Sequence, residues 1–353
     1  MLNFQSLIVY TGALSISFLF AHISEKRNNK YLVWIIVLML SLIAGLRSVS
    51  VGIDTKTYDL VFSLITEGYL RPMYGIEKNY VLLCSFFLKL WNNHQFLLFV
   101  FAFITHGLIL FRLWYERNHI SFSFGVISYY ILFFGFSLNG MRQMFAASIV
   151  FYSTIFVKKG KYFHFLIAVL IAAQFHSSAL IGIAYLLFEI IFIKYFSAKR
   201  KLIIWLNFFL VILIGLFVTI ELLDIYSKYF EVRDSSIGLM MVIKCGLLFT
   251  SIYIVKLPKN KDLNYLLYSY RWYYFVGLTL NSLNYFFMYL GRIGVYFYLF
   301  EAIYIGIIFK MKNRNYLVLF FKGIYLMLLI YYFVESLTRG PQGEIPYLFF
   351  WQV

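Results

Sequence analysis

Long apolar runs recur along almost the whole chain, and they constrain the fold more than any other feature. A helix that crosses the hydrocarbon core of a bilayer needs about 20 mostly apolar residues. Hydrophobic residues make up 62% of the 353 residues, whereas a soluble domain holds roughly 45–50%. The sequence therefore predicts one all-α integral membrane domain over residues 1–353. About twelve segments are expected to span the membrane, roughly 5–22, 31–46, 95–111, 120–138, 141–157, 162–175, 176–193, 202–220, 237–255, 267–288, 293–309 and 316–334.

Basic residues gather in the short connections between these runs, and this fixes the predicted orientation. Lysine and arginine are enriched in cytoplasmic loops, so the six basic connections are expected to be cytoplasmic and both termini extracytoplasmic. The same distribution accounts for the formal net charge of +16. We therefore expect the lipid bilayer, and no nucleic acid, as a partner. The six connections hold 18 of the 31 Lys and Arg residues and cover 23–30, 112–119, 158–161, 194–201, 256–266 and 310–315.

One apolar run does not fit the series of spans. Residues 80–91 are apolar but too short to cross a bilayer comfortably. Counting this run as a span would also invert every later loop and place the basic clusters outside. We expect it to be a short interfacial or re-entrant helix within one long outer segment, 47–94.

The chain lacks the motifs of several common chemistries. It has no Walker-type phosphate loop, no HExxH helix and no GxSxG turn. Its two cysteines, Cys84 and Cys245, have no metal-ligand spacing. No cofactor and no metal ion are predicted.

Polar residues stand at the predicted outer ends of the apolar segments. They are Arg47, Asp54, Arg142, His176 and Arg292. Charge in or beside a bilayer is costly, so a convergent set of this kind indicates a functional site. Each residue also has a simpler interpretation. The arginines could extend to the headgroups, Asp54 could cap a helix, and His176 could be an ordinary helix-end residue.

Glu77, just before the short helix, adds a carboxylate that could also be merely solvated. Taken together, these residues match one kind of chemistry better than they match separate structural roles. Arginine is always cationic and forks onto phosphate oxygens, which suits a lipid-linked phosphate or pyrophosphate. Histidine or a carboxylate can accept the proton of a sugar hydroxyl. The candidate bases are His176, Asp54 and Glu77.

Several strings in this chain resemble the EpsG/Wzy-type polysaccharide polymerases, in order, from about residue 30 to 310. Gly140 and Met141 depart slightly from the pattern, since the family often has a larger aliphatic residue before the arginine. The matching strings are Arg47 followed by Val51-Gly52-Ile53-Asp54-Thr55-Lys56-Thr57-Tyr58, Glu77 before an apolar helix, Met141-Arg142-Gln143-Met144-Phe145-Ala146-Ala147-Ser148, Phe175-His176-Ser177-Ser178-Ala179-Leu180, and Arg292-Ile293-Gly294-Val295-Tyr296-Phe297.

The resemblance implies a multi-pass enzyme of the bacterial plasma membrane, similar to GT-C-type glycosyltransferases, with its site on the outer face. Such enzymes transfer a glycan chain from undecaprenyl pyrophosphate to a sugar hydroxyl of another lipid-linked repeat unit. A chain-length regulator and a flippase are the expected protein partners. Under this hypothesis Arg142 and Arg292, together with Arg47, hold the pyrophosphate, and His176 is preferred over Asp54 and Glu77 as the base.

Three other functions remain open on sequence grounds. A flippase or exporter of lipid-linked oligosaccharide would bind pyrophosphate without chemistry, but such transporters often contain internal repeats and broken helices, and neither stands out here. A ligase-type glycan transferase would differ from a polymerase only in its acceptor. A membrane O-acyltransferase usually carries its histidine deeper in a span.

Overall fold

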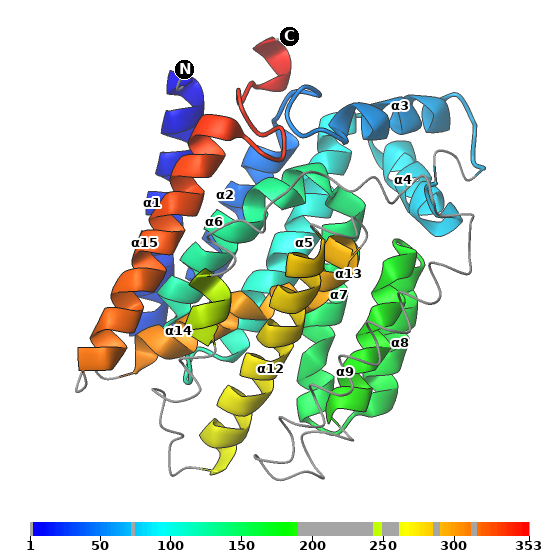
Figure 1. Cartoon of the computed structure of the whole chain (residues 1–353). Helices are drawn as coiled ribbons and strands as arrows, with labels where there is room; N and C mark the ends of the chain where they lie inside the picture. Colours follow the sequence, from blue (N-terminus) through cyan, green and yellow to red (C-terminus); the bar gives the residue numbers. More distant parts are fainter. Residues whose placement is uncertain are drawn as a thin grey trace.

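The computed structural model describes residues 3–71, 75–189, 243–248, 261–284, 290–311 and 316–352. These residues form a bundle of helices (Figure 1). Within the described part of the chain, the extended pairing is limited to a single bridge between Arg47 and Phe349. The all-helical class predicted from the apolar runs is confirmed.

The N-terminal half of the bundle contains five long helices that pack side by side. Helix α2 packs on α1 and α5, α6 packs on α1, and α7 packs on α5. Polar residues mark the helix ends. The Asn93 side chain, for example, accepts a hydrogen bond from Phe96 N–H and so caps α5. The five helices are α1 (Phe4–Arg27), α2 (Tyr31–Gly45), α5 (His94–Tyr115), α6 (Phe122–Asn139) and α7 (Met141–Lys158).

The C-terminal half adds shorter and more broken helices. Helix α12 crosses α13 closely at Gly277, where an added Cβ would lie 2.4 Å from the backbone nitrogen of Tyr298. Only glycine permits this approach, and the crossing places the start of α13 beside the outer end of α12. The elements are α8 (Tyr162–Ala173), η1 (Ser177–Gly182), α9 (Ile183–Leu187), α12 (Lys261–Leu283), α13 (Leu290–Tyr298), α14 (Phe300–Lys310), α15 (Tyr316–Arg339) and η4 (Phe350–Gln352).

Five described helical stretches are long and apolar enough to cross a membrane: α1, α5, α6, α13 together with α14 (Leu290–Lys310), and α15. Helices α2, α8 and the Ser177–Leu187 stretch are apolar but shorter. Of the predicted spans, 202–220 lies outside the described residues, and 237–255 is described only over 243–248. The membrane-protein class is thus supported, while the number of twelve spans and the GT-C-like architecture stay predictions.

The outer segment 47–94 folds into two helices, α3 (Thr55–Thr66) and α4 (Lys78–Leu90). The short helix predicted at 80–91 is α4. Its buried residues, among them Val81, Cys84 and Leu88, join a hydrophobic cluster shared with α3, α5 and α7. Asp54 stands at the predicted N-cap of α3, but its side chain makes no capping hydrogen bond.

After α15, the chain returns along the face predicted to be extracytoplasmic and binds the start of the outer segment. Backbone hydrogen bonds join Ser48 N–H to Leu348 C=O at 2.8 Å and Gly52 N–H to Gly343 C=O at 2.8 Å. Gly343 has a φ of +75°, and an added Cβ there would lie 2.9 Å from the backbone nitrogen of Ile53. Glycine is therefore required for this contact. The tail, residues 340–352, holds the outer segment against the bundle.

Candidate functional site

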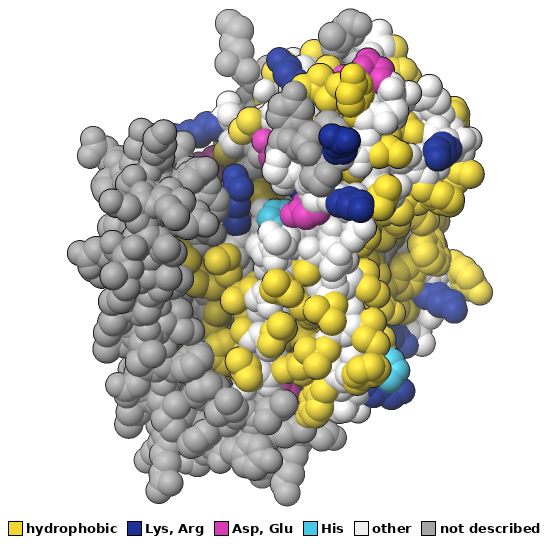
Figure 2. Space-filling model, turned by 90° about the vertical axis from the view of Figure 1, so that its right-hand side faces the viewer, with side chains coloured by type: hydrophobic (Ala, Val, Ile, Leu, Met, Phe, Trp, Pro, Cys, Tyr) yellow, Lys and Arg dark blue, Asp and Glu magenta, His cyan; other side chains and the backbone are white. Residues whose placement is uncertain are grey.

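Three of the predicted site residues meet at the end of the bundle that the sequence predicts to be extracytoplasmic, called the outer end below. Glu77 precedes α4, Arg142 lies in the first turn of α7, and His176 is the N-cap residue of η1. Arg142 Nη1 and Glu77 Oε2 form an ion pair, and Glu77 Oε1 accepts a hydrogen bond of 3.0 Å from Ser177 N–H. Figure 2 shows a histidine and an acidic side chain between basic side chains on this face. We call Glu77, Arg142 and His176 the outer cluster.

The sharp connection between α6 and α7 positions Arg142. Helix α6 ends at Asn139 and α7 begins at Met141, so Gly140 alone separates them. The guanidinium carbon of Arg142 lies 5.8 Å from the centre of the Tyr80 ring. Its Nε atom is buried and has no hydrogen-bond partner in the part of the chain that the structure describes. A buried donor without an acceptor is costly, so this group is suited to an anionic ligand.

The hydrogen bonds of His176 define its neutral tautomer. Its Nδ1 accepts from the backbone N–H of Ser178 at 3.4 Å, and Ser178 Oγ lies 2.9 Å from the same nitrogen. Ser178 Oγ is also 3.0 Å from the hydroxyl of Tyr296. A backbone N–H can only donate, so the hydrogen-bond network assigns the proton of neutral His176 to Nε2. Nε2 makes no hydrogen bond among the described residues, so it can donate to a ligand.

Burial and neighbouring charges keep His176 neutral at pH 7. Burial lowers the pKa of His176 from 6.5 to about 4; the Glu77 carboxylate opposes this shift, and the charges of Arg142 and Arg292 add to it. At working pH the outer cluster therefore contains one carboxylate, one guanidinium group and a neutral imidazole, with the guanidinium of Arg292 nearby.

Arg292 lies beside the outer cluster at the start of α13. Its side chain is exposed, and its backbone carbonyl accepts a hydrogen bond from Gln143 Nε2, next in sequence to Arg142. Arg292 also lines a cavity of about 290 Å³ between α6, α12, α13 and the tail. The structure thus brings the fourth predicted residue to the same region.

Asp54 lies at the edge of this region. Its backbone N–H donates to Asn139 Oδ1 at 2.8 Å, and Asn139 Nδ2 donates to Gln342 Oε1 at 2.9 Å. The exposed carboxylate of Asp54 makes no hydrogen bond or ion pair with the described residues. Tyr58 interacts electrostatically with both Asp54 and Arg142. Burial raises the pKa of Tyr58, the positive charge of Arg142 lowers it, and Asp54 raises it.

Arg47 is not brought to the outer cluster. Its side chain is only 1% exposed. Three of its nitrogens donate to backbone carbonyls: Nη1 to Ala44, Nε to Val51 at 3.3 Å, and Nη2 to Leu138 at 2.9 Å. It joins the end of α2, the outer segment and the end of α6. The side chain does not extend to the headgroups, the simpler alternative, because it turns inward to satisfy helix-end carbonyls.

Sequence reasoning missed three residues as members of this region: Tyr58, Gln143 and Tyr296. All three stand inside the strings that resemble the polymerases, which was the available signal. Tyr58 follows Asp54 by one helical turn. Among the described residues, no group of three or more His, Cys, Asp and Glu side chains is placed to hold a metal ion.

The comparison with known families identifies the chain. The EpsG family matches residues 30–349, nearly the whole sequence. The chain belongs to the EpsG family. This is a family of Wzy-type polysaccharide polymerases, so the resemblance predicted from the sequence is confirmed. No curated protein and no solved structure matches the chain.

Membership in the EpsG family implies a polysaccharide polymerase with a glycosyl-transfer reaction. It also fits the multi-pass membrane character of the described helices. The four polar residues that gather at the outer end of this EpsG-family bundle all stand in or beside the matching strings. The outer cluster and Arg292 are therefore the candidate site.

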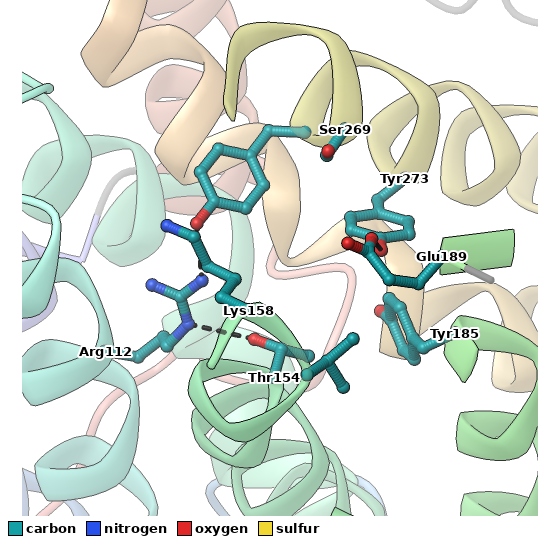
Figure 3. A pocket seen from close by; sticks show the side chains of 9 residues that line it. Arg112, Thr154, Lys158, Tyr185, Glu189, Ser269 and Tyr273 are labelled. Atoms are coloured by element: carbon teal, nitrogen blue, oxygen red, sulfur yellow. Dashed lines mark hydrogen bonds between the residues drawn. The ribbon is translucent and has the colours of Figure 1, made fainter. Parts of the chain in front are cut away.

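A second charged group lies at the opposite end of the EpsG-family bundle. Arg112 forms an ion pair with Glu116 at 2.9 Å and donates to Thr154 at 3.0 Å, and Lys158 pairs with Glu116 at 2.6 Å. Tyr270 donates to the same Glu116 oxygen at 2.5 Å. The adjoining cavity, also lined by Glu189 (Figure 3), has a volume of about 10 Å³, roughly room for one water. This network joins α5, α7 and α12.

Two further buried carboxylates stand within the bundle, Glu301 and Glu189. Glu301 forms an ion pair of 2.9 Å with Lys244. Glu189 accepts a hydrogen bond from the hydroxyl of Tyr273 at 2.9 Å. Both lie away from the outer cluster.

Proposed function

We propose that this chain polymerises lipid-linked oligosaccharide repeat units at the extracytoplasmic face of the bacterial plasma membrane. The anomeric carbon of the donor sugar forms a bond with a hydroxyl oxygen of the acceptor unit. The bond between that carbon and undecaprenyl pyrophosphate breaks, so undecaprenyl pyrophosphate leaves. The acceptor proton passes to a base. One observation carries the proposal: in a chain of the EpsG family, the outer cluster and Arg292 gather at one end of the bundle.

Arg142 and Arg292 are the pyrophosphate-binding residues in this account. The Nε of Arg142, which is buried and has no hydrogen-bond partner among the described residues, is the donor that we assign to a phosphate oxygen. Negative charge grows on the pyrophosphate as the glycosidic bond breaks. Fixed donors aimed at such charge are often the largest catalytic contribution.

The two oxygens of Glu77 are already engaged, one with Arg142 and one with Ser177 N–H. We therefore assign Glu77 to positioning Arg142 and the start of η1.

His176, with its proton on Nε2, donates a hydrogen bond to a substrate oxygen. Of the three candidate bases, Asp54 is the carboxylate left without a partner among the described residues, and it takes the acceptor proton. Arg47 takes a structural role.

Complementation of a polymerase-null bacterium that makes the cognate glycan tests this function. Wild type is expected to restore long polymer. Arg142→Ala and Arg292→Ala, at matched membrane abundance, are expected to leave single lipid-linked repeat units on the outer face. Arg339 is an exposed arginine after the last span, outside the cluster, so Arg339→Ala is the matched control and should restore polymer. Accumulation of unpolymerised units on the cytoplasmic face would instead identify a flippase.

A further inference from the structure

The cavity beside Arg292 has a mixed lining that neither the sequence nor the family assigns to a ligand. Its volume of about 290 Å³ is close to the lower end of the range for small-ligand sites, roughly 300–1,000 Å³. Its wall is built from the outer half of α6, the outer end of α12, the start of α13 and the tail. The lining includes the aromatic rings of Phe133 and Phe136 and the amides of Asn281, Asn284 and Gln342.

Three side-chain amides face one cavity, and each retains hydrogen-bonding capacity. Asn281 makes no side-chain hydrogen bond with any described residue. Asn284 Oδ1 accepts a hydrogen bond from Gly291 N–H at 3.1 Å, which leaves the Nδ2 amide group of Asn284 able to donate to a ligand. Gln342 Oε1 accepts a hydrogen bond from Asn139 Nδ2, which likewise leaves the Nε2 amide group of Gln342 able to donate to a ligand. None of the three carries charge.

This lining matches the chemistry of a sugar. Each hydroxyl of a sugar ring both donates and accepts hydrogen bonds, and an amide offers both a carbonyl oxygen and an NH₂ group. The C–H faces of the ring can pack on apolar and aromatic surface, here Phe133 and Phe136. An apolar pocket with a few convergent polar groups is the usual form of a small-ligand site.

Arg292 determines which sugar this would be. The arginine borders the cavity and belongs to the proposed pyrophosphate site, so a phosphate at Arg292 would sit next to the cavity opening. The sugar bonded directly to the pyrophosphate is the one that could reach from Arg292 into the cavity. We propose that the cavity binds this first sugar of the lipid-linked donor. The assignment rests on the proposed polymerase function, since it takes the pyrophosphate position from there.

Binding measurements on the purified full-length chain test the assignment. The first probe is the lipid-linked repeat unit extracted from polymerase-null cells, and the second is undecaprenyl pyrophosphate without sugar. Wild type should bind the sugar-bearing lipid more tightly. Asn281→Leu keeps the size of the side chain but removes the amide, and should weaken binding of the sugar-bearing lipid about three- to tenfold, the effect of one lost hydrogen bond. Its affinity for the sugar-free lipid should not change.

Two controls keep the outcome decisive. Asn92 is an exposed asparagine in the outer segment, and Asn92→Leu should leave both affinities unchanged. Asn281→Ala removes the same amide without adding bulk, so it should reproduce the loss if the leucine variant folds poorly. Unchanged affinities in both Asn281 variants, or equal losses for the two lipids, would overturn the assignment.

The readouts of this experiment separate the cavity from the proposed function. If wild type makes no polymer but prefers the sugar-bearing lipid, and Asn281→Leu loses that preference, the cavity assignment stands and the polymerase function fails. If wild type polymerises and the Asn281 variants retain the preference, the polymerase function stands and the cavity assignment fails.

Discussion

At the scale of single residues, Arg47 and Arg142 show how two arginines at the same membrane face differ. Arg47 is enclosed, and its nitrogens are directed to three carbonyls. Arg142 pairs with one carboxylate through Nη1, and its buried Nε donor has no partner in the part of the chain that the structure describes. The first arrangement stabilises the fold, and the second can bind an anion.

Substitution of Arg47 should therefore act on stability. Arg47→Leu leaves three backbone carbonyls without their donor, and each such loss costs about 1–3 kcal/mol. We expect a decrease in the free energy of unfolding on the order of 3 kcal/mol, measured by thermal or denaturant unfolding in detergent. The folded fraction should still bind undecaprenyl pyrophosphate within about twofold of wild type, a change well under the tenfold that 1.4 kcal/mol represents. A stable Arg47→Leu variant that loses this binding would show that Arg47 binds the pyrophosphate.

His176 should remain neutral well below the pH at which an ordinary histidine is protonated. Its pKa is lowered from 6.5 to about 4. In ¹⁵N NMR spectra, with the His176 signal identified by its loss in His176→Gln, the Nε2–H tautomer should persist from pH 7.5 to about 5. Because the unfolded chain takes up the proton first, the stability linked to His176 is full above pH 6.5 and is lost as pH falls toward about 4. A titration midpoint near 6.5, or the Nδ1–H tautomer, would contradict this account.

The sequence located Arg142, Glu77, His176 and Arg292 because charge at the ends of apolar runs is rare and stands out. It could not separate Arg47 from them, since the pattern shows where an arginine lies along the chain and not which carbonyls surround it. The order of preference among the three candidate bases, His176, Asp54 and Glu77, also depends on the contacts that their side chains make. Only the structure shows that both Glu77 oxygens are engaged and that His176 Nδ1 accepts a hydrogen bond.

At the scale of elements, α4 is apolar on two faces. One face packs into the cluster that it shares with α3, α5 and α7. The other exposes Leu82, Phe86 and Leu90, which follow each other at intervals of four residues and are 42%, 56% and 65% exposed. A helix of 13 residues is too short to span a bilayer. An exposed apolar stripe on such a helix indicates contact with lipid at the membrane surface.

A spin label can test this contact. In a background with both native cysteines replaced, a label at Phe86→Cys should be broadened by lipid-soluble oxygen and protected from a water-soluble nickel chelate. A label at Lys56→Cys, an exposed position on α3, is the water-facing control and should show the opposite pattern. Access of the nickel chelate to position 86 equal to that at position 56 would show that α4 does not face lipid.

The elements most easily predicted were the long apolar helices, because their length and composition are set by the bilayer. Helix α4 was also predicted, from its shortness. The tail 340–352 was predicted only as an external segment. Its hydrogen bonds to residues 46–53 join parts of the chain about 300 residues apart, and no local pattern encodes such pairing. The cavity near Arg292 depends on that tail and was missed for the same reason.

At the scale of the whole molecule, the orientation in the membrane is the assumption on which the site depends. Cysteines introduced at the exposed Ser50 and at Ser178 should react with an impermeant maleimide in intact cells. A cysteine at Lys161, in the predicted cytoplasmic connection 158–161, should react only after permeabilisation. Cys84 and Cys245 must first be replaced. The reverse pattern would show that the outer cluster faces the cytoplasm, where it could not contact the proposed extracytoplasmic substrate.

The most direct test of the central claim uses the purified chain in liposomes, supplied with the lipid-linked repeat unit on the face that carries the outer cluster. We expect long glycan and one undecaprenyl pyrophosphate released for each bond formed. Arg142→Ala should lower the initial rate about 10²–10³-fold, the usual effect of removing one transition-state donor, and Arg339→Ala should match wild type. Transfer of repeat units across the bilayer, with neither polymer nor released undecaprenyl pyrophosphate, would contradict the account.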